Sequence, residues 1–260
     1  MQTGALTGYM DVAQVTLWAF WIFFAGLIFY LRREDRREGY PLESDPTGEV
    51  SPQGFLLIPP PKTFLLPHGG EVQAPRAGDR DTRPIKARRT AAWPGAPLEP
   101  TGDAMADGVG PASYAQRADK PDLTAEGHVK IVPLRVASSV TVAEEDPDPR
   151  GKDVIGADGR VAGTVSDIWV DRSEMIIRYY EVALPAEGRR KPTVVLLPSG
   201  FASVDGRGRI HVGSILSDQF AGVPKTAAPD RVTLLEEDKI MGYYAGGTLY
   251  ATPARAEPFI

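Results

Sequence analysis

One stretch of the sequence constrains the fold more than any other: residues 12–31 form a run of twenty residues without a charged side chain. An α-helix rises about 1.5 Å per residue, so this run spans roughly 30 Å, the thickness of the hydrocarbon layer of a bilayer. A buried core helix is the alternative interpretation. The length and the apolar purity of the run favour one transmembrane helix.

The residues that flank this run predict its orientation. Residues 1–11 contain no Lys or Arg, whereas four arginines lie within residues 32–37. Because positive charge gathers on the cytoplasmic side of a membrane, we expect residues 1–11 to be a periplasmic tail and the rest of the chain to be cytoplasmic. A cleaved signal peptide would need a basic segment before the run and a small-residue cleavage site after it, and the sequence has neither.

Composition excludes several classes of function. The net charge of -5 provides no basic field for nucleic acid, and the absence of cysteine excludes disulfides, thiol nucleophiles and thiolate metal sites. The sequence has no phosphate-binding loop, no GxSxG and no HExxH. Its three histidines, His68, His128 and His211, lack the spacing of metal ligands. We therefore expect a protein that is neither an enzyme nor a metal-binding chain.

Residues 32–124 are rich in proline, with 14 of the 24 prolines between positions 41 and 121. Proline is excluded from helix interiors and central strands, so the segment is either a disordered linker or an extended arm. Disordered linkers are depleted in large apolar residues, yet this segment carries Phe55, Leu57, Phe64 and Leu66. We expect an arm that packs on partner subunits.

Residues 125–260 are predicted to form a mainly-β domain. Short apolar runs at 130–142, 161–170, 176–184, 193–197 and 210–212 indicate strands. The Asp-Gly pairs at 158–159 and 205–206 are typical of hairpin turns. The apolar residues change faces near Ser166, which suggests a β-bulge. Several short strands with tight turns predict a small antiparallel barrel.

The last part of this domain is predicted to be helical. Thr233 and Glu236 fit a capping box, so we expect a helix to begin there. The Gly246-Gly247 pair is interpreted as its C-terminal stop, and residues 214–221 as a shorter helix. The predicted fold is therefore one N-terminal transmembrane α-helix followed by a cytoplasmic mainly-β domain with a C-terminal α-helix.

A predicted hairpin brings several charged residues together. With a turn after Asp171, this residue pairs with Ile176, and Trp169 pairs with Arg178. Asp167, Asp171 and Arg178 then share one mostly apolar face, where a guanidinium needs a carboxylate partner. The group is either a structural ion-pair cluster or a set of side chains that pass protons near neutral pH.

A second group of charged residues comprises Asp119, Asp122, Glu126 and His128, with Lys130 just beyond. A histidine beside a carboxylate can titrate between about pH 5 and 8. The alternative is a solvated loop without a role in chemistry.

Six stretches of the sequence closely resemble the H subunit of the photosynthetic reaction centre of purple bacteria. They follow the order of that family through nearly the whole chain: 31–42 (LRREDRREGYPL), 61–70 (PKTFLLPHGG), 100–114 (PTGDAMADGVGPASY), 130–137 (KIVPLRVA), 165–174 (VSDIWVDRSE) and 233–253 (TLLEEDKIMGYYAGGTLYATP). The resemblance implies one membrane helix and a cytoplasmic domain of the PRC-barrel type, in the bacterial inner, photosynthetic membrane.

The resemblance also implies a role. An H subunit binds no pigment; it caps the L and M subunits, which hold bacteriochlorophyll, bacteriopheophytin, quinones and a non-haem iron, and it helps to deliver protons to the secondary quinone. A cytochrome subunit and light-harvesting proteins are further partners that this family can have in the same assembly. The implied function is that of a non-catalytic subunit.

By motif, Glu174 stands where the family has an interior acid near the quinone, and Asp171 and Arg178 match charged family positions. His128 matches one of two histidines at which protons enter, while Glu126 replaces the other and Thr124 replaces a nearby acid. A carboxylate–histidine pair would collect protons with a lower working pKa. At the membrane interface, the resemblance points to four lipid-contacting residues: Tyr30, Arg32, Arg33 and Tyr40.

Two other functions compete with this one. The first is a free-standing, membrane-anchored PRC-barrel adaptor, against which the apolar arm and the length of the resemblance both count. The second is an unrecognised membrane-tethered enzyme, against which the missing catalytic motifs count.

Overall fold

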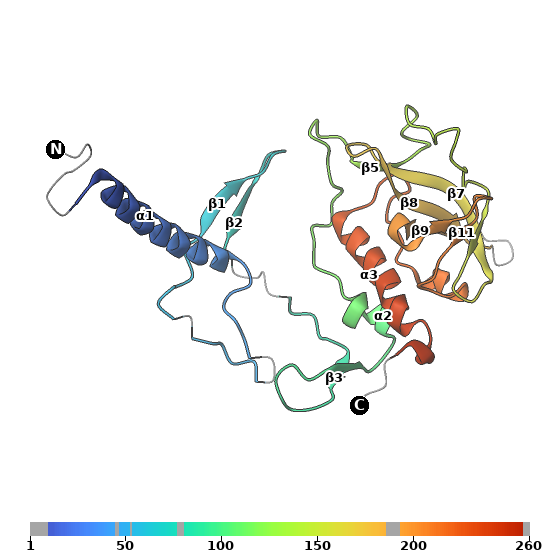
Figure 1. The fold of residues 1–260 in the computed structure, drawn as a ribbon. Helices are drawn as coiled ribbons and strands as arrows, with labels where there is room; N and C mark the ends of the chain where they lie inside the picture. Colours follow the sequence, from blue (N-terminus) through green and yellow to red (C-terminus); the bar gives the residue numbers. More distant parts are fainter. Residues whose placement is uncertain (1–9, 45–46, 53, 77–80, 186–192, 257–260) are drawn as a thin grey trace. The chain divides into compact units, whose positions relative to one another are not determined.

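The protein folds as two compact units in the computed structural model, which describes residues 10–44, 47–52, 54–76, 81–185 and 193–256 (Figure 1). The first unit comprises Met1–Thr82 and Ala91–Ala96, and the second comprises Arg83–Thr90 and Pro97–Ile260. Residues 83–90 and 97–124, which we assigned to the arm, thus belong to the second unit. Most of the predicted periplasmic tail, at residues 1–9, lies outside the described residues.

Helix α1, Val12–Glu34, contains the predicted membrane run. Asp11 caps its N-terminus by accepting a hydrogen bond of 2.7 Å from the backbone N–H of Gln14. Its side chains are exposed on all sides, including Trp18 at 60% and Ile22 at 72%. The helix and the 3-10 turn that follows it contain a window of mean hydropathy 2.0, so this segment is apolar and long enough to span a bilayer.

An arginine in the 3-10 turn Asp35–Arg37, just after α1, joins parts of the first unit. Arg37 donates hydrogen bonds of 2.8 and 2.9 Å to the carboxylate of Glu34, and it also reaches the carbonyl oxygens of Pro60 at 2.8 Å and Ala74 at 2.9 Å. Strands β1 (Lys62–Leu65) and β2 (Glu71–Ala74) form an antiparallel hairpin that ends at Ala74. The arm is therefore folded in part. The planar guanidinium group of Arg37, which has five N–H donors, joins the arm to α1.

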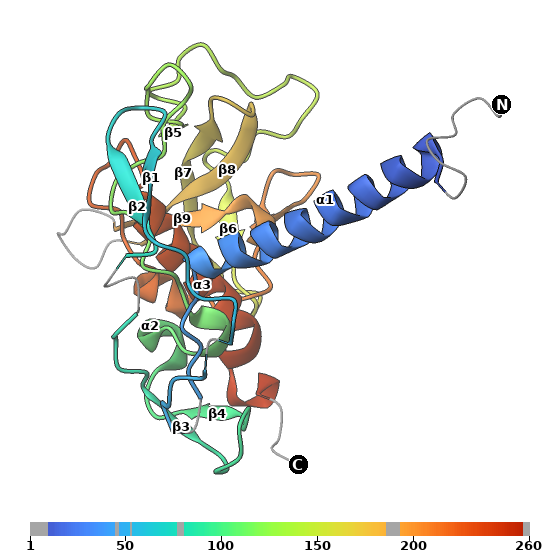
Figure 2. The same ribbon diagram turned by 90° about the vertical axis from the view of Figure 1, so that its left-hand side faces the viewer.

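The second unit is built on a seven-stranded sheet with the order β10-β11-β6-β7-β8-β9, and β5 pairs with β7 (Figure 1; Figure 2). Its strands are β5 (Ile131–Pro133), β6 (Asp153–Ile155), β7 (Val161–Asp171), β8 (Ile176–Ala183), β9 (Val194–Pro198), β10 (Ser203–Val204) and β11 (Ile210–His211). This confirms the mainly-β fold class. All pairs are antiparallel as expected except β11 with β6, which is parallel.

Both predicted Asp-Gly turns are confirmed, because residues 158–159 connect β6 to β7 and residues 205–206 connect β10 to β11. The predicted bulge is also confirmed by a register shift between Val165 and Asp167. A second shift follows Trp169, which pairs with Tyr179 and not with Arg178 as expected. The pairing of Asp171 with Ile176 is confirmed.

Helix α3, Leu234–Tyr250, begins with the predicted capping box, in which Thr233 and Glu236 exchange hydrogen bonds. The predicted stop at Gly246 and Gly247 is wrong, because both glycines lie inside the helix. A Cβ at Gly246 would lie 2.6 Å from the Cβ of Ala112, so glycine here permits close packing and does not end the helix.

Two shorter elements of the second unit lie against α3. Helix α2 (Ala104–Asp107) and the 3-10 turn Gly110–Ala112 pack against α3. Residues 214–221 were expected to be helical, but only the 3-10 turn Asp218–Gly222 forms. Phe220 from this turn packs edge-on against Tyr244 of α3, and both side chains are fully buried. The core thus lies between the sheet and α3.

Gly247→Ala is expected to destabilise the second unit. The added methyl group would lie 2.4 Å from Ile215 Cγ2 and 2.6 Å from the carbonyl oxygen of Ser214. Overpacking costs about 1–3 kcal/mol, and the backbone contact favours the upper part of that range, whereas alanine gains only about 1 kcal/mol of helix propensity over glycine. Thermal unfolding of the full chain in detergent should show a melting temperature several degrees lower. Gly200→Ala is the control, since its Cβ meets nothing within 4 Å; equal losses in both variants would contradict the packing argument.

Candidate functional site

A short hairpin at residues 122–130 forms one side of the candidate site. Leu123 and Val129 form an antiparallel bridge, and the backbone N–H of Lys130 donates to the carbonyl oxygen of Asp122 at 2.9 Å. Asp122 and Lys130 therefore face each other at the base of the 122–130 hairpin. The sequence places these two residues in one charged group but predicts no contact between them.

The tip of the 122–130 hairpin carries the predicted pair Glu126 and His128, both exposed. Thr124 closes the turn, because its N–H donates to the His128 carbonyl oxygen at 2.8 Å and its hydroxyl accepts from the His128 N–H at 3.3 Å. The hydrogen bond of the Thr124 hydroxyl, a backbone N–H and the charge of His128 lower the pKa of Glu126 below its usual range. The tip thus presents a negative charge to solvent beside a titratable imidazole.

The turn between β7 and β8 forms the opposite side of the site and is organised by Asp171. The side chain of Asp171 is 1% exposed, and its carboxylate accepts hydrogen bonds from the backbone N–H groups of Ser173 at 2.8 Å and Glu174 at 3.0 Å. The carbonyl oxygen of Asp171 accepts from the Met175 N–H at 2.8 Å. A buried carboxylate therefore determines where Glu174 leaves the turn.

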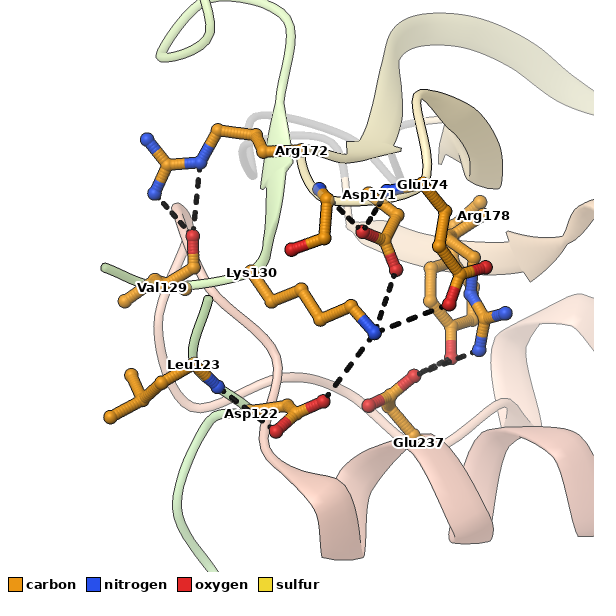
Figure 3. A network of polar contacts seen from close by, with 11 residues as sticks. Asp122, Leu123, Val129, Lys130, Asp171, Arg172, Glu174, Arg178 and Glu237 are labelled. Atoms are coloured by element: carbon orange, nitrogen blue, oxygen red, sulfur yellow. Dashed lines mark hydrogen bonds and ion pairs between the residues drawn. The ribbon is translucent and has the colours of Figure 1, made fainter. Parts of the chain in front are cut away.

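Lys130 joins the two sides (Figure 3). Its Nζ lies 3.3 Å from an oxygen of Asp171, 3.3 Å from one of Glu174 and 3.8 Å from one of Asp122. Partial burial alone would lower the pKa of Lys130, but the hydrogen bonds and charges of Asp171 and Glu174 outweigh this effect and raise the pKa. We call these four residues the Lys130 cluster; it contains three carboxyl groups and one ammonium group.

Arg172 ties the 122–130 hairpin to the sheet, as Figure 3 shows. Its Nε donates to the carbonyl oxygen of Val129 at 3.0 Å, and its backbone N–H donates to that of Lys130 at 3.0 Å. Ile131 of β5 pairs with Asp171 of β7 in the same sheet. The hairpin tip and the Lys130 cluster are thereby held on one framework.

Arg178 does not contact the carboxylates that we expected. In the part of the chain that the structure describes, its Nη2 lies 3.7 Å from Glu237 of α3, and its side chain is 41% exposed. The predicted pairing with Asp171 and Asp167 is therefore wrong. The register shift after Trp169 is the reason, because it moves Arg178 out of the position opposite Trp169.

Asp167 belongs to a separate ion-pair cluster. Arg135 Nη1 lies 2.9 Å from Asp167 and 2.8 Å from Glu181, and the indole N–H of Trp169 donates to Glu181 at 2.9 Å. Asp167 and Glu181 face each other in the β7–β8 register. Sequence reasoning missed Arg135 and Glu181, although opposite positions on the two strands could have indicated the carboxyl pair.

Glu237 is a further buried carboxyl group that sequence reasoning missed. It is 7% exposed and accepts a hydrogen bond of 2.8 Å from the Tyr179 hydroxyl. Burial raises the pKa of Glu237, against the opposing effects of Tyr179, Arg178 and Arg117; the charge of Asp122 adds to the increase. The acidic run 236–238 indicated only a helix N-terminus, so its contact with the sheet could not be foreseen.

The predicted lipid-contacting residues lie at the C-terminal end of α1 and just beyond it, in the first unit. Tyr30 is 52% exposed, and Arg32 lies 3.6 Å from Asp35 with 69% of its side chain exposed. Arg33 is also exposed, and Tyr40 lies under the guanidinium of Arg36, 5.2 Å from the ring centroid. Cationic and aromatic side chains are thus gathered at one end of the membrane run.

Two family models match this chain. Residues 4–136 match a model described as the photosynthetic reaction centre, H-chain N-terminal region, which is just over half of the 260 residues. Residues 142–215 match the PRC-barrel domain and contain strands β6 to β11. The first match includes α1 and the 122–130 hairpin, and the second includes the turn that carries Asp171 and Glu174.

Proposed function

This chain belongs to the photosynthetic reaction centre H-chain family, and from this premise we propose that it caps the L and M subunits and conducts protons to the secondary quinone. A quinone under a protein cap cannot collect protons directly from bulk water. It needs titratable side chains at hydrogen-bond spacing, with pKa values near the ambient pH. The chain itself acts as a non-catalytic subunit.

The single observation that carries the proton role is the Lys130 cluster. The ammonium group of Lys130 lies within 3.3 Å of both Asp171 and Glu174. Lys130 is also the last residue of the hairpin that carries Glu126 and His128. Charged groups that share hydrogen bonds can rearrange protons without the cost of separating isolated charges. The contacts therefore support a path that starts at the hairpin tip and passes through the cluster.

Each predicted residue has a role in this path. Glu126 and His128 attract and collect protons from solvent. Asp171, anchored by two backbone N–H groups, holds Lys130 and so keeps the cluster together. Glu174 is the delivering acid, since its side chain is 54% exposed although it is paired with Lys130, and it can therefore meet a partner subunit. Arg178 acts indirectly, through the ion pair that it forms with Glu237.

The apolar surface of the first unit supports the capping role. Phe55 is 83% exposed, Leu57 66%, Phe64 40% and Leu66 38%. Large apolar side chains gathered on one segment are typical of an interaction surface. We infer that L and M cover them, which would stabilise the assembly by about 1.5–3 kcal/mol for each fully buried side chain.

The same proposal gives the chain its place in the membrane. Helix α1 spans the bacterial inner, photosynthetic membrane once, with the N-terminus in the periplasm and the chain from residue 32 onward in the cytoplasm. Tyr30, Arg32, Arg33 and Tyr40 contact lipid head groups at the cytoplasmic interface, where aromatic and basic residues are favoured. The bacteriochlorophyll, bacteriopheophytin, quinones and non-haem iron belong to L and M; a cytochrome subunit and light-harvesting proteins can join the assembly.

Purification in mild detergent tests the capping role. We expect the chain to elute with pigment-bearing partners, and Phe55→Ser with Leu57→Ser to weaken this association by about tenfold or more for each lost apolar contact. Val161→Ser, which alters an exposed apolar side chain of the second unit, is the control. A chain that elutes alone and colourless would contradict the proposal and favour a free-standing anchored adaptor.

Glu174→Gln tests the delivering acid. The amide cannot release a proton, so the second electron transfer to the quinone and the accompanying proton uptake should slow by about tenfold or more, while the first electron transfer stays nearly unchanged. Flash spectroscopy with a pH-indicator dye measures all three. Glu145→Gln, an exposed carboxyl group elsewhere, is the control. Unchanged proton uptake in the Glu174 variant would leave that residue a structural role only.

Replacing both Glu126 and His128, by Gln and Ala, tests the hairpin tip. Proton uptake should slow because the negative charge and the imidazole are both lost, whereas the lowered pKa of Glu126 predicts a smaller effect for Glu126→Gln alone near neutral pH. The measurement is the rate of dye-detected proton uptake from about pH 6 to 9. Equal rates for the double variant and the unmodified protein over this range would move the site of proton collection elsewhere.

A further inference from the structure

Glu237 is a buried carboxyl group that is not part of the proposed proton path. It lies on α3 and is 7% exposed. Its Oε2 accepts the Tyr179 hydrogen bond at 2.8 Å and lies 3.7 Å from Nη2 of Arg178. The charge of Asp122, a member of the Lys130 cluster, acts on Glu237, and Figure 3 shows both carboxyl groups. A carboxyl group in this position is either a structural acceptor for Tyr179 or a place where a proton is held.

The charges that face Glu237 come from three elements. Arg178 and Tyr179 face it from β8, and Arg117 and Asp122 face it from the segment that precedes β5. On α3 itself, Asp238 is engaged by Arg117 at 3.4 Å. The arginines and the tyrosine favour the carboxylate, whereas burial and the charge of Asp122 favour the protonated acid.

Burial has the larger effect, so the pKa of Glu237 is raised above its usual range. Tyr179 does not compete for the proton, because its own pKa is raised by burial and by the charge of Glu237, so it stays a hydrogen-bond donor. Because Asp122 is a member of the Lys130 cluster and interacts with Glu237 through its charge, negative charge in the cluster increases the proton affinity of Glu237.

We propose that Glu237 is an internal proton-storing carboxyl group, coupled through Asp122 to the Lys130 cluster. It binds a proton from solvent when negative charge appears near the cluster, by forming an O–H bond at its carboxylate, and it releases that proton when the charge is neutralised. This proposal depends on the proposed function for the source of the charge, which is the reduced quinone.

Proton uptake by the purified complex after a single flash, measured against pH, tests this inference. Glu237→Gln can still accept the Tyr179 hydrogen bond but cannot bind a proton. We expect less uptake per reduced quinone than in the unmodified complex, and the loss of an infrared signal in the carbonyl-stretch region of protonated carboxyl groups. Glu145→Gln, an exposed carboxyl group, should change neither. An uptake curve and infrared spectrum identical to those of the unmodified complex would overturn the proposal.

Tyr179→Phe separates proton storage from a structural role. The variant keeps Glu237 but removes a hydrogen bond that lowers its pKa, so the pH window of uptake should move to higher pH. A structural acceptor would lose its donor without any such shift. An unmoved window would count against proton storage, even if the Glu237 variant fails to assemble.

Stability measured against pH gives a result that needs no partner. A carboxyl group whose pKa is raised in the folded chain contributes stability below its unfolded pKa and loses it as the pH rises through the folded value. The melting temperature of the full chain with Glu237→Gln, relative to the unmodified chain, should therefore increase as the pH rises. A difference in melting temperature that does not change with pH would overturn the inference about Glu237 and leave the proposed function untouched. Normal quinone reduction in the Glu174→Gln variant would instead overturn the proposed proton path.

Discussion

The buried carboxylate of Asp171 is the constraint on which the site depends. A charge taken out of water is costly unless hydrogen bonds and a counter-charge replace its solvation. Asp171 receives two backbone N–H groups from its own turn and the ammonium of Lys130. These contacts set the exit of Glu174 from the turn and bring the 122–130 hairpin onto the sheet. Electrostatic compensation of one group thus aligns segments that are far apart in the sequence.

The two compact units differ in how far they bury their apolar side chains. The second unit has its own core, in which Trp169, Phe220 and Tyr244 are fully buried. The first unit leaves its helix and the arm residues Phe55 and Leu57 exposed. Such surfaces are stable only in lipid or against a partner, which agrees with a chain of the reaction centre H-chain family.

Sequence reasoning was reliable where the physical cause is local. The capping box at Thr233, the two Asp-Gly turns and the bulge before Asp167 depend on neighbouring residues, and all are confirmed. The Arg178 pairing was wrong because a register shift depends on how two whole strands fit together. The helix stop at Gly247 was wrong because glycine serves equally for a helix stop and for close packing, and the distinction depends on the tertiary neighbours Ser214 and Ile215.

The sequence by itself determined the apolar helix, the mainly-β class of the second unit and the residues at the hairpin tip, because periodicity, turn chemistry and charge asymmetry act over a few residues. Tertiary structure alone decided which charges meet. Lys130 reaches Asp171 and Glu174 across more than forty positions of sequence, and Glu237 reaches Tyr179 across 58. Burial in the tertiary structure also decided how strongly a carboxyl group such as Glu237 binds a proton, since its proton affinity depends on the solvent and the charges around it.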